Sequence, residues 1–181
     1  PLKEAFTLSD WPVEGTVELA EMTLTGQYEK PAGTGQMKIV NGTAWEEPFD
    51  LVTGRLDFRG DGSLAVNEMK MSKFGGEVRG NAVVDWVDNT YGFHAETEGP
   101  GIPMQALRNF EVEQAPLTGQ LTFVADGAGS FDAPSWTIAG NIQDLYAGCE
   151  GIGPVRARLA MAGDVLRIEE LVADSDRLHV F

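Results

Sequence analysis

The sequence predicts an all-β protein, and three observations lead to this fold class. Apolar and polar residues alternate along most of the chain, which is the pattern of strands with one buried face. Short turn-forming sequences recur between the alternating segments. A strand-and-turn pattern in the first half returns in the second half. We therefore expect a long antiparallel meander folded into an elongated groove with an apolar interior, plus one or two short helices.

The repeat is the clearest single feature of the chain. The offset between matched positions falls from 104 at Gly15 and Gly119 to 102 at Glu68 and Glu170, as small length differences at turns would produce. We expect a first β-repeat unit at residues 1–104 and a second, truncated unit at 105–181. Both units should form one continuous sheet, as a fragment of a larger protein. The matched segments are Pro12–Leu19 with Pro116–Phe123, and Val52–Leu56 with Val155–Leu159.

The predicted strands are separated by short sequences of Gly, Asp and Asn, and Asp-Gly and Asn-Gly supply the positive φ of tight hairpin turns. Helical spacing occurs only at 2–6 and 104–110, and Pro103 suits the first turn of the second helix. We expect each short helix to cap or plug the end of a sheet segment. The predicted turns are Asn41-Gly42, Gly60-Asp61-Gly62, Gly75-Gly76, Asp88-Asn89, Asp126-Gly127 and Gly163-Asp164.

The charge of the chain excludes one class of partner. The formal net charge is −15, whereas a nucleic-acid-binding protein needs a basic surface to displace counterions from phosphates. The same acidity argues against adsorption of the outer face to anionic lipid headgroups. Cys149 is the single cysteine, so an intramolecular disulfide and a cysteine-based zinc site are both excluded.

We find no set of residues for catalysis or metal binding. His94 lies on the polar phase of a predicted strand and His179 lies far from it in sequence, and neither has a partner at ligand spacing. Cys149 lacks a neighbouring cation, so we interpret it as a buried or incidental thiol. The acidic residues lack the spacing of a calcium loop and indicate a solvated face. We therefore expect no enzymatic activity, no metal and no cofactor.

The apolar phase of the predicted strands is the remaining candidate site. Its ordinary interpretation is a buried core. The alternative is a groove, because a one-faced sheet that continues through successive repeats must fold over on itself or hold apolar ligands. Such a surface would accept acyl chains, with each buried CH₂ contributing about 0.8 kcal/mol. The residues expected to face inward are Val17, Leu19, Leu56, Phe58, Leu64, Val66, Val84, Trp86, Phe93, Leu121, Phe123, Trp136, Ile138, Leu159, Leu166 and Ile168.

Several segments together resemble the AsmA-like superfamily and, within it, the TamB family, the inner-membrane subunit of the translocation and assembly module. The resemblance covers most of the chain, although each motif is a loose strand-and-turn pattern. Order and completeness make it specific. The segments that carry the resemblance are 74–82, the predicted helix 103–110 followed by 116–121, 127–136 with 142–145, and 155–159 with 163–171.

This resemblance implies a folded-over β-groove ("β-taco") in a periplasmic part of a protein anchored in the inner membrane of a Gram-negative bacterium. The implied ligands are phospholipid acyl chains, conducted between the inner and outer membranes. An alternative family role is assistance of outer-membrane protein assembly, with an outer-membrane β-barrel protein as partner. Two other classes stay open: a structural or adhesive β-repeat module of a large surface protein, and a carbohydrate-binding β-sandwich.

Overall fold

The computed structural model describes residues 13–44, 47–108, 115–174 and 179–180. It is nearly all antiparallel β-structure, which confirms the predicted fold class. One short 3₁₀-helix, η1 (Met104–Ala106), interrupts the strands. The strands are β1 (Val13–Gln27), β2 (Lys30–Ala44), β3 (Glu47–Arg59), β4 (Ser63–Lys73), β5 (Gly76–Asp85), β6 (Thr90–Glu98), β7 (Ile102–Pro103), β8 (Leu117–Ser130), β9 (Ser135–Ala147), β10 (Glu150–Ala162), β11 (Val165–Asp174) and β12 (His179–Val180).

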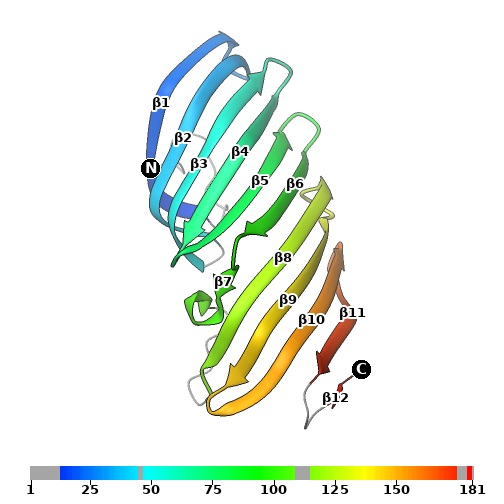
Figure 1. Cartoon of the computed structure of the whole chain (residues 1–181). Coiled ribbons are helices and arrows are strands. Elements are labelled where there is room, and N and C mark those ends of the chain that lie inside the picture. The colour runs from blue at the N-terminus through cyan, green and yellow to red at the C-terminus, as the bar shows by residue number, and fades with distance from the viewer. Residues whose placement is uncertain (1–12, 45–46, 109–114, 175–178, 181) are drawn as a thin grey trace.

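All of these strands belong to one sheet, in which each strand lies beside its neighbour in sequence (Figure 1). The exception is β7, which pairs with β8 below the end of β6 and lies off the main path of the sheet. A two-sheet sandwich is therefore not the architecture of the described part of the chain. No helix there has the length and apolar composition that a bilayer crossing needs.

Four of the predicted turns are confirmed, and two are wrong. Asn41-Gly42 lies inside β2 and Asp126-Gly127 lies inside β8. Asn41 does have the positive φ that the dipeptide suggested, at 49°, but it uses this conformation in a β-bulge. Gly127 meets a different need, because the ring of Phe93 on the neighbouring strand occupies the space of a side chain there.

The segment predicted as a helix at 104–110 is interrupted within its described part. Met104–Ala106 forms a helical turn, Leu107 is extended, and Arg108 is again helical. Pro103 ends β7 in an extended conformation just before this turn. Phe110, like the helix predicted at 2–6, lies outside the described residues.

The two halves of the sheet share a bulge at matched positions of the repeat. The β1–β2 pair is bulged at Gly15 and Asn41, and the β8–β9 pair is bulged at Gly119 and Asp144. Gly15 and Gly119 have φ values of 151° and 143°, and Asn41 and Asp144 have φ values of 49° and 48°. Each bulge inserts an extra residue and increases the local twist of the sheet. The repeat therefore includes the positions at which the sheet bends.

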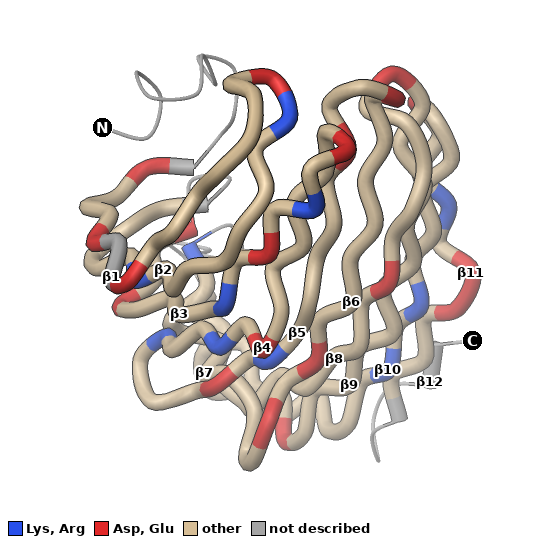
Figure 2. Tube along the Cα trace, turned by 90° about the horizontal axis from the view of Figure 1, so that it is seen from above, with Lys and Arg blue, Asp and Glu red and all other residues tan. Residues whose placement is uncertain are grey.

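The sheet is curved, as the view from above shows (Figure 2). The indole Nε1–H of Trp86, just after β5, donates to the carbonyl oxygen of Glu29 in the β1–β2 turn at 3.0 Å. In a flat sheet, β2 and β5 would lie about 14 Å apart, three interstrand spacings. The contact therefore requires strong curvature. Towards the other end of β2 and β3, Ile39, Phe49 and Val52 form a buried apolar cluster.

Candidate functional site

The candidate site is the apolar face, which we define as the sheet face that carries Leu56 and the residues in register with it. One cross-strand row on this face runs from β2 to β11 without a charged or polar side chain. Because residues directly opposite each other in a sheet share a face, backbone register alone assembles this row. Its members are Gly35, Leu56, Val66, Ala82, Phe93, Gly127, Trp136, Met161 and Leu166.

The structure places fifteen of the sixteen predicted inward residues in strands, and their register agrees with this face. Trp86 is the exception, because it follows the end of β5 and its indole crosses toward the β1–β2 turn. Leu19 is opposite Met37 in the register, although its side chain is outside the described set. Leu56 and Phe58 are buried. The residues that are half-buried are Val17, Leu64, Val66, Val84, Phe93, Leu121, Phe123, Trp136, Ile138 and Leu159.

The cover over the apolar face decreases from the first half of the chain to the second. In β3, Leu56 and Phe58 are each 5% exposed, whereas in β11 Leu166 and Ile168 are 56% and 65% exposed. Leu166 and Ile168 match Leu64 and Val66 in the repeat, and these first-half residues are half-buried. Leu166 and Ile168 therefore lie on the predicted face but are exposed there, since β11 has a full-length neighbour on only one side.

Aromatic rings and glycines alternate in the middle of the apolar face. Phe93 lies over Gly127, and Trp136 is on the other side of this glycine in the same row. An open hollow of about 370 Å³ lies next to them, lined also by Asp126, Ser135 and Thr137. The absence of a side chain at Gly127 gives Phe93 its position. The hollow includes residues of both faces, since Asp126 and Thr137 belong to the polar phase of β8 and β9.

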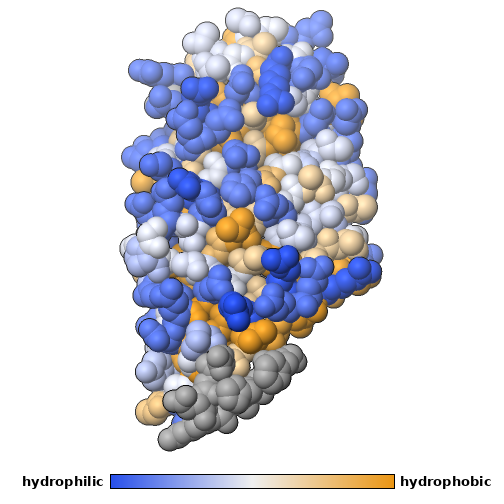
Figure 3. Space-filling model, turned by 45° about the vertical axis from the view of Figure 1, so that its right-hand side comes forward, coloured by the Kyte–Doolittle hydropathy of each residue, from blue (hydrophilic) through white to orange (hydrophobic). Residues whose placement is uncertain are grey.

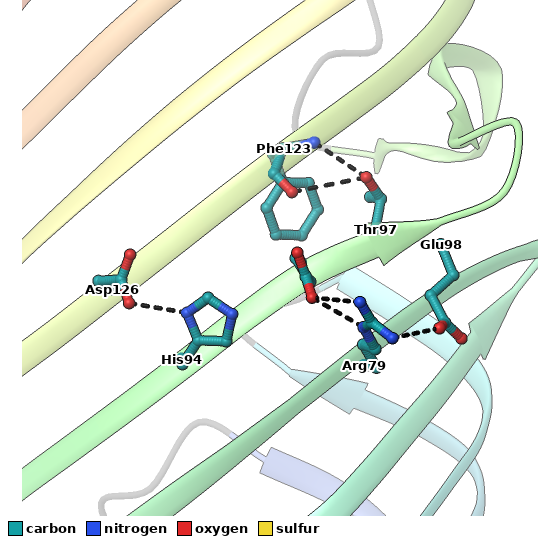
Figure 4. A network of polar contacts seen from close by, with 7 residues as sticks. Arg79, His94, Thr97, Glu98, Phe123 and Asp126 are labelled. Carbon is teal, nitrogen blue, oxygen red and sulfur yellow. Dashed lines mark hydrogen bonds and ion pairs between the residues drawn. The ribbon is translucent and has the colours of Figure 1, made fainter.

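The opposite face is polar, and several of its charges are paired across strands. The Arg79 guanidinium lies 2.7 Å from Glu96 Oε1 and 2.9 Å from Glu98 Oε1 (Figure 4). The hydrogen bond to Glu96 raises the pKa of Arg79 above its ordinary value. His94 Nδ1 lies 2.7 Å from Asp126 Oδ1 on β8. Figure 3 shows that hydrophilic residues cover most of the surface in that view, with hydrophobic atoms in patches and along one margin.

The contact between His94 and Asp126 was not found from the sequence. The two residues are 32 positions apart, and only the β6–β8 register makes them opposite each other. The pair still lacks a metal-binding neighbour: the described residues contain no group of three or more His, Cys, Asp or Glu that could hold a metal ion. Cys149 is exposed and free, so the buried alternative for this thiol is wrong.

The turn between β3 and β4 lowers the pKa of one carboxyl group, that of Asp61. The Oγ–H and the backbone N–H of Ser63 donate to Asp61 Oδ1 at 2.7 and 2.9 Å. These hydrogen bonds favour the ionised form, so the pKa of Asp61 is below its ordinary value. The Gly60-Asp61-Gly62 segment is therefore a capped hairpin turn, as the sequence predicted.

Sequence reasoning also missed a buried ion pair beside the core. Lys73 is 3% exposed, and its Nζ donates to Glu47 Oε2 at 2.7 Å and to the Pro48 carbonyl oxygen at 2.6 Å. The alternation in β4 offered a weak signal, since Lys73 is two residues after the core-packed Met71. A lysine on an apolar phase suggests a buried partner, but the sequence does not identify Glu47, which is 26 residues away.

Comparison of the chain with protein-family models, curated proteins and solved structures finds no match.

Proposed function

We propose that this chain is a non-enzymatic segment of a periplasmic groove that shields phospholipid acyl chains and conducts them between membranes. The observation that carries the proposal is the uncharged row that crosses nine strands, from Gly35 on β2 to Leu166 on β11. An acyl chain needs no hydrogen-bonding partner, so a surface without directional groups suits it. Each CH₂ group that leaves water contributes about 0.8 kcal/mol.

The uneven cover of the apolar face supports a ligand surface over a purely structural core. Leu166, Ile168 and Leu171 on β11 are between 46% and 65% exposed, although they lie on the same face as buried residues of β3. Contiguous exposed apolar side chains mark binding surfaces in soluble proteins. The resemblance of the sequence to the AsmA-like superfamily favours lipid as the bound molecule and the periplasm as the location.

Native mass spectrometry of the purified chain tests the proposal. We expect adducts with the masses of phospholipids, and we expect delipidated protein to take up a phospholipid labelled with a fluorophore on one acyl chain. Polar organic solvent should release the adducts, since no covalent bond holds them.

A structural β-repeat module gives a different result. It would appear as a single lipid-free mass, and the fluorescence of the labelled phospholipid would be the same with the protein as in buffer alone. That outcome would overturn the proposed function and favour a scaffold that binds protein through its acidic exterior.

A further inference from the structure

Residues Gly99–Arg108, which we call the strap, lie between the two halves of the apolar face. Thr97 marks the point at which β6 leaves β8: its Oγ1 accepts the Phe123 backbone N–H at 3.1 Å, in place of a regular ladder bond. The chain then returns to β8, where Ile102 and Pro103 pair with Leu121 and Gln120. Ile102 is the most deeply buried apolar residue of the described chain, at 2% exposure, and Met104 is 3% exposed.

The strap also contacts β5 and β3, which lie on the side of the strap away from β8. A Cβ atom on Gly76, at the start of β5, would lie 2.8 Å from the Gly101 carbonyl oxygen and 3.0 Å from Ile102 Cα. Further along, the Arg108 backbone N–H donates to Glu47 Oε2 at 3.1 Å, at the start of β3. Since β4, β5 and β6 separate β3 from β8, the strap must cross the lower ends of β4 and β5.

Glu47 is the residue that holds the far end of the strap. Its carboxylate oxygen Oε2 accepts from both the buried Lys73 ammonium and the Arg108 backbone N–H. Both bonds are charge-assisted, which makes them stronger than neutral hydrogen bonds. The tie therefore joins the strap to the lower end of the Ile39–Phe49–Val52 cluster, where Met71 packs two residues before Lys73.

We propose that the strap is a gate in the lower part of the apolar face, between a covered section formed by Ile39, Val52 and Val78 and an open section formed by Ile168 and Leu171. With the strap tied to Glu47, Ile102 and Met104 fill the space between β5 and β8 and separate the two sections in the lower part of the sheet. Release of the tie exposes the covered section to lipid held on the open section. The inference rests on the proposed function for its ligand and on the strap contacts for its mechanism.

The test removes the hydrogen bond between Glu47 and the strap without leaving a buried charge. In the variant Glu47→Ala/Lys73→Met, both partners of the ion pair are removed together, since a lone buried lysine would destabilise the fold. The control is Asp50→Asn, whose carboxylate accepts the Phe74 N–H at the same end of the sheet and does not contact the strap. Urea unfolding shows that each variant is folded under the assay conditions.

Two measurements are made on each protein. Hydrogen–deuterium exchange of peptides from 101–108 reports release of the strap, and the rate of fluorescent phospholipid uptake reports opening of the face. In the double variant we expect strap exchange to rise by about tenfold, as loss of charge-assisted hydrogen bonds predicts. Exchange in β9 and β10 should stay unchanged, and lipid uptake should be faster. The control should match the parent in both measurements.

The outcomes separate the gate from the proposed function. Unchanged strap exchange in the double variant overturns the role of Glu47. Faster exchange with an unaltered uptake rate overturns the gate and leaves the groove intact. An equal effect of Asp50→Asn also overturns the gate, because the effect would not be specific to the strap. Faster strap exchange with no uptake by any protein, the parent included, overturns the proposed function itself.

Discussion

Two glycines on the described apolar side lie directly beneath aromatic rings of a neighbouring strand. A Cβ atom on Gly42 would lie 2.2 Å from Phe49 Cζ, and one on Gly127 would lie 2.2 Å from Phe93 Cε1. Carbon atoms cannot approach this closely, so any side chain at these positions would move the ring. The aromatic ring fills the space that a side chain on the glycine would occupy. Because the packing is close, the ring has little room to move.

A matched pair of substitutions tests this packing. Gly127→Ala should lower the free energy of unfolding by about 1–3 kcal/mol, the usual cost of overpacking. Gly140→Ala, also inside a strand of the second half, should change it by less than about 0.5 kcal/mol, because the nearest atom to the new Cβ is 3.6 Å away. Urea denaturation measures both values. Equal losses at the two sites would contradict the role assigned to Phe93.

The paired bulges are the corresponding feature at the scale of elements. Asn41 in β2 and Asp144 in β9 both have φ close to +48°, and both are the extra residue of a bulge that bends a hairpin. Asn and Asp tolerate this left-handed conformation better than other non-glycine residues, and a β-branched residue there is strained. The bulges thus set the bend of each half through a few backbone angles.

Substitution of Asp144 tests the bulge in the second half. Asp144→Val should cost about 1–2 kcal/mol of unfolding free energy, because valine is strained at positive φ. Asp144→Gly should be neutral or slightly stabilising, since glycine adopts this conformation without strain. Urea denaturation again provides the measurement. A valine variant as stable as the parent would mean that β9 is straight at this position.

At the scale of the whole molecule, one sheet presents two chemically different faces. On β8, Phe123 follows the apolar phase and is half-buried, whereas Val124 is opposite Glu96 on the polar face and is 40% exposed. These two adjacent residues of β8 therefore point to opposite faces of the sheet. For a charge substitution on the apolar face, Phe123 is a better position than Phe58. Phe58 is 5% exposed, and a charge in its place would destabilise the fold.

The two positions give a test of which face takes up lipid. Phe123→Lys should abolish phospholipid adducts in native mass spectra, because an ammonium group on the apolar face must keep its water. Val124→Lys should retain the adducts of the parent, since the new charge points to solvent near Glu96. Circular dichroism verifies that both variants keep the strand content. Loss of lipid from both variants, or from neither, would contradict an apolar-face site.

The alternation of the sequence determined the strands and the face of most apolar residues in them, because side-chain direction in a strand has a local period of two. It did not determine exposure: Leu64 and Leu166 occupy matched positions, yet only Leu166 is exposed, because their strands differ in neighbours. Turn chemistry misled at Asn41 and Gly127 for a similar reason, since a positive φ or a missing side chain serves several purposes. The contacts of the strap, the Lys73–Glu47 pair and His94 with Asp126 depend on curvature and register over long sequence separations. Those properties arise only when the whole sheet forms.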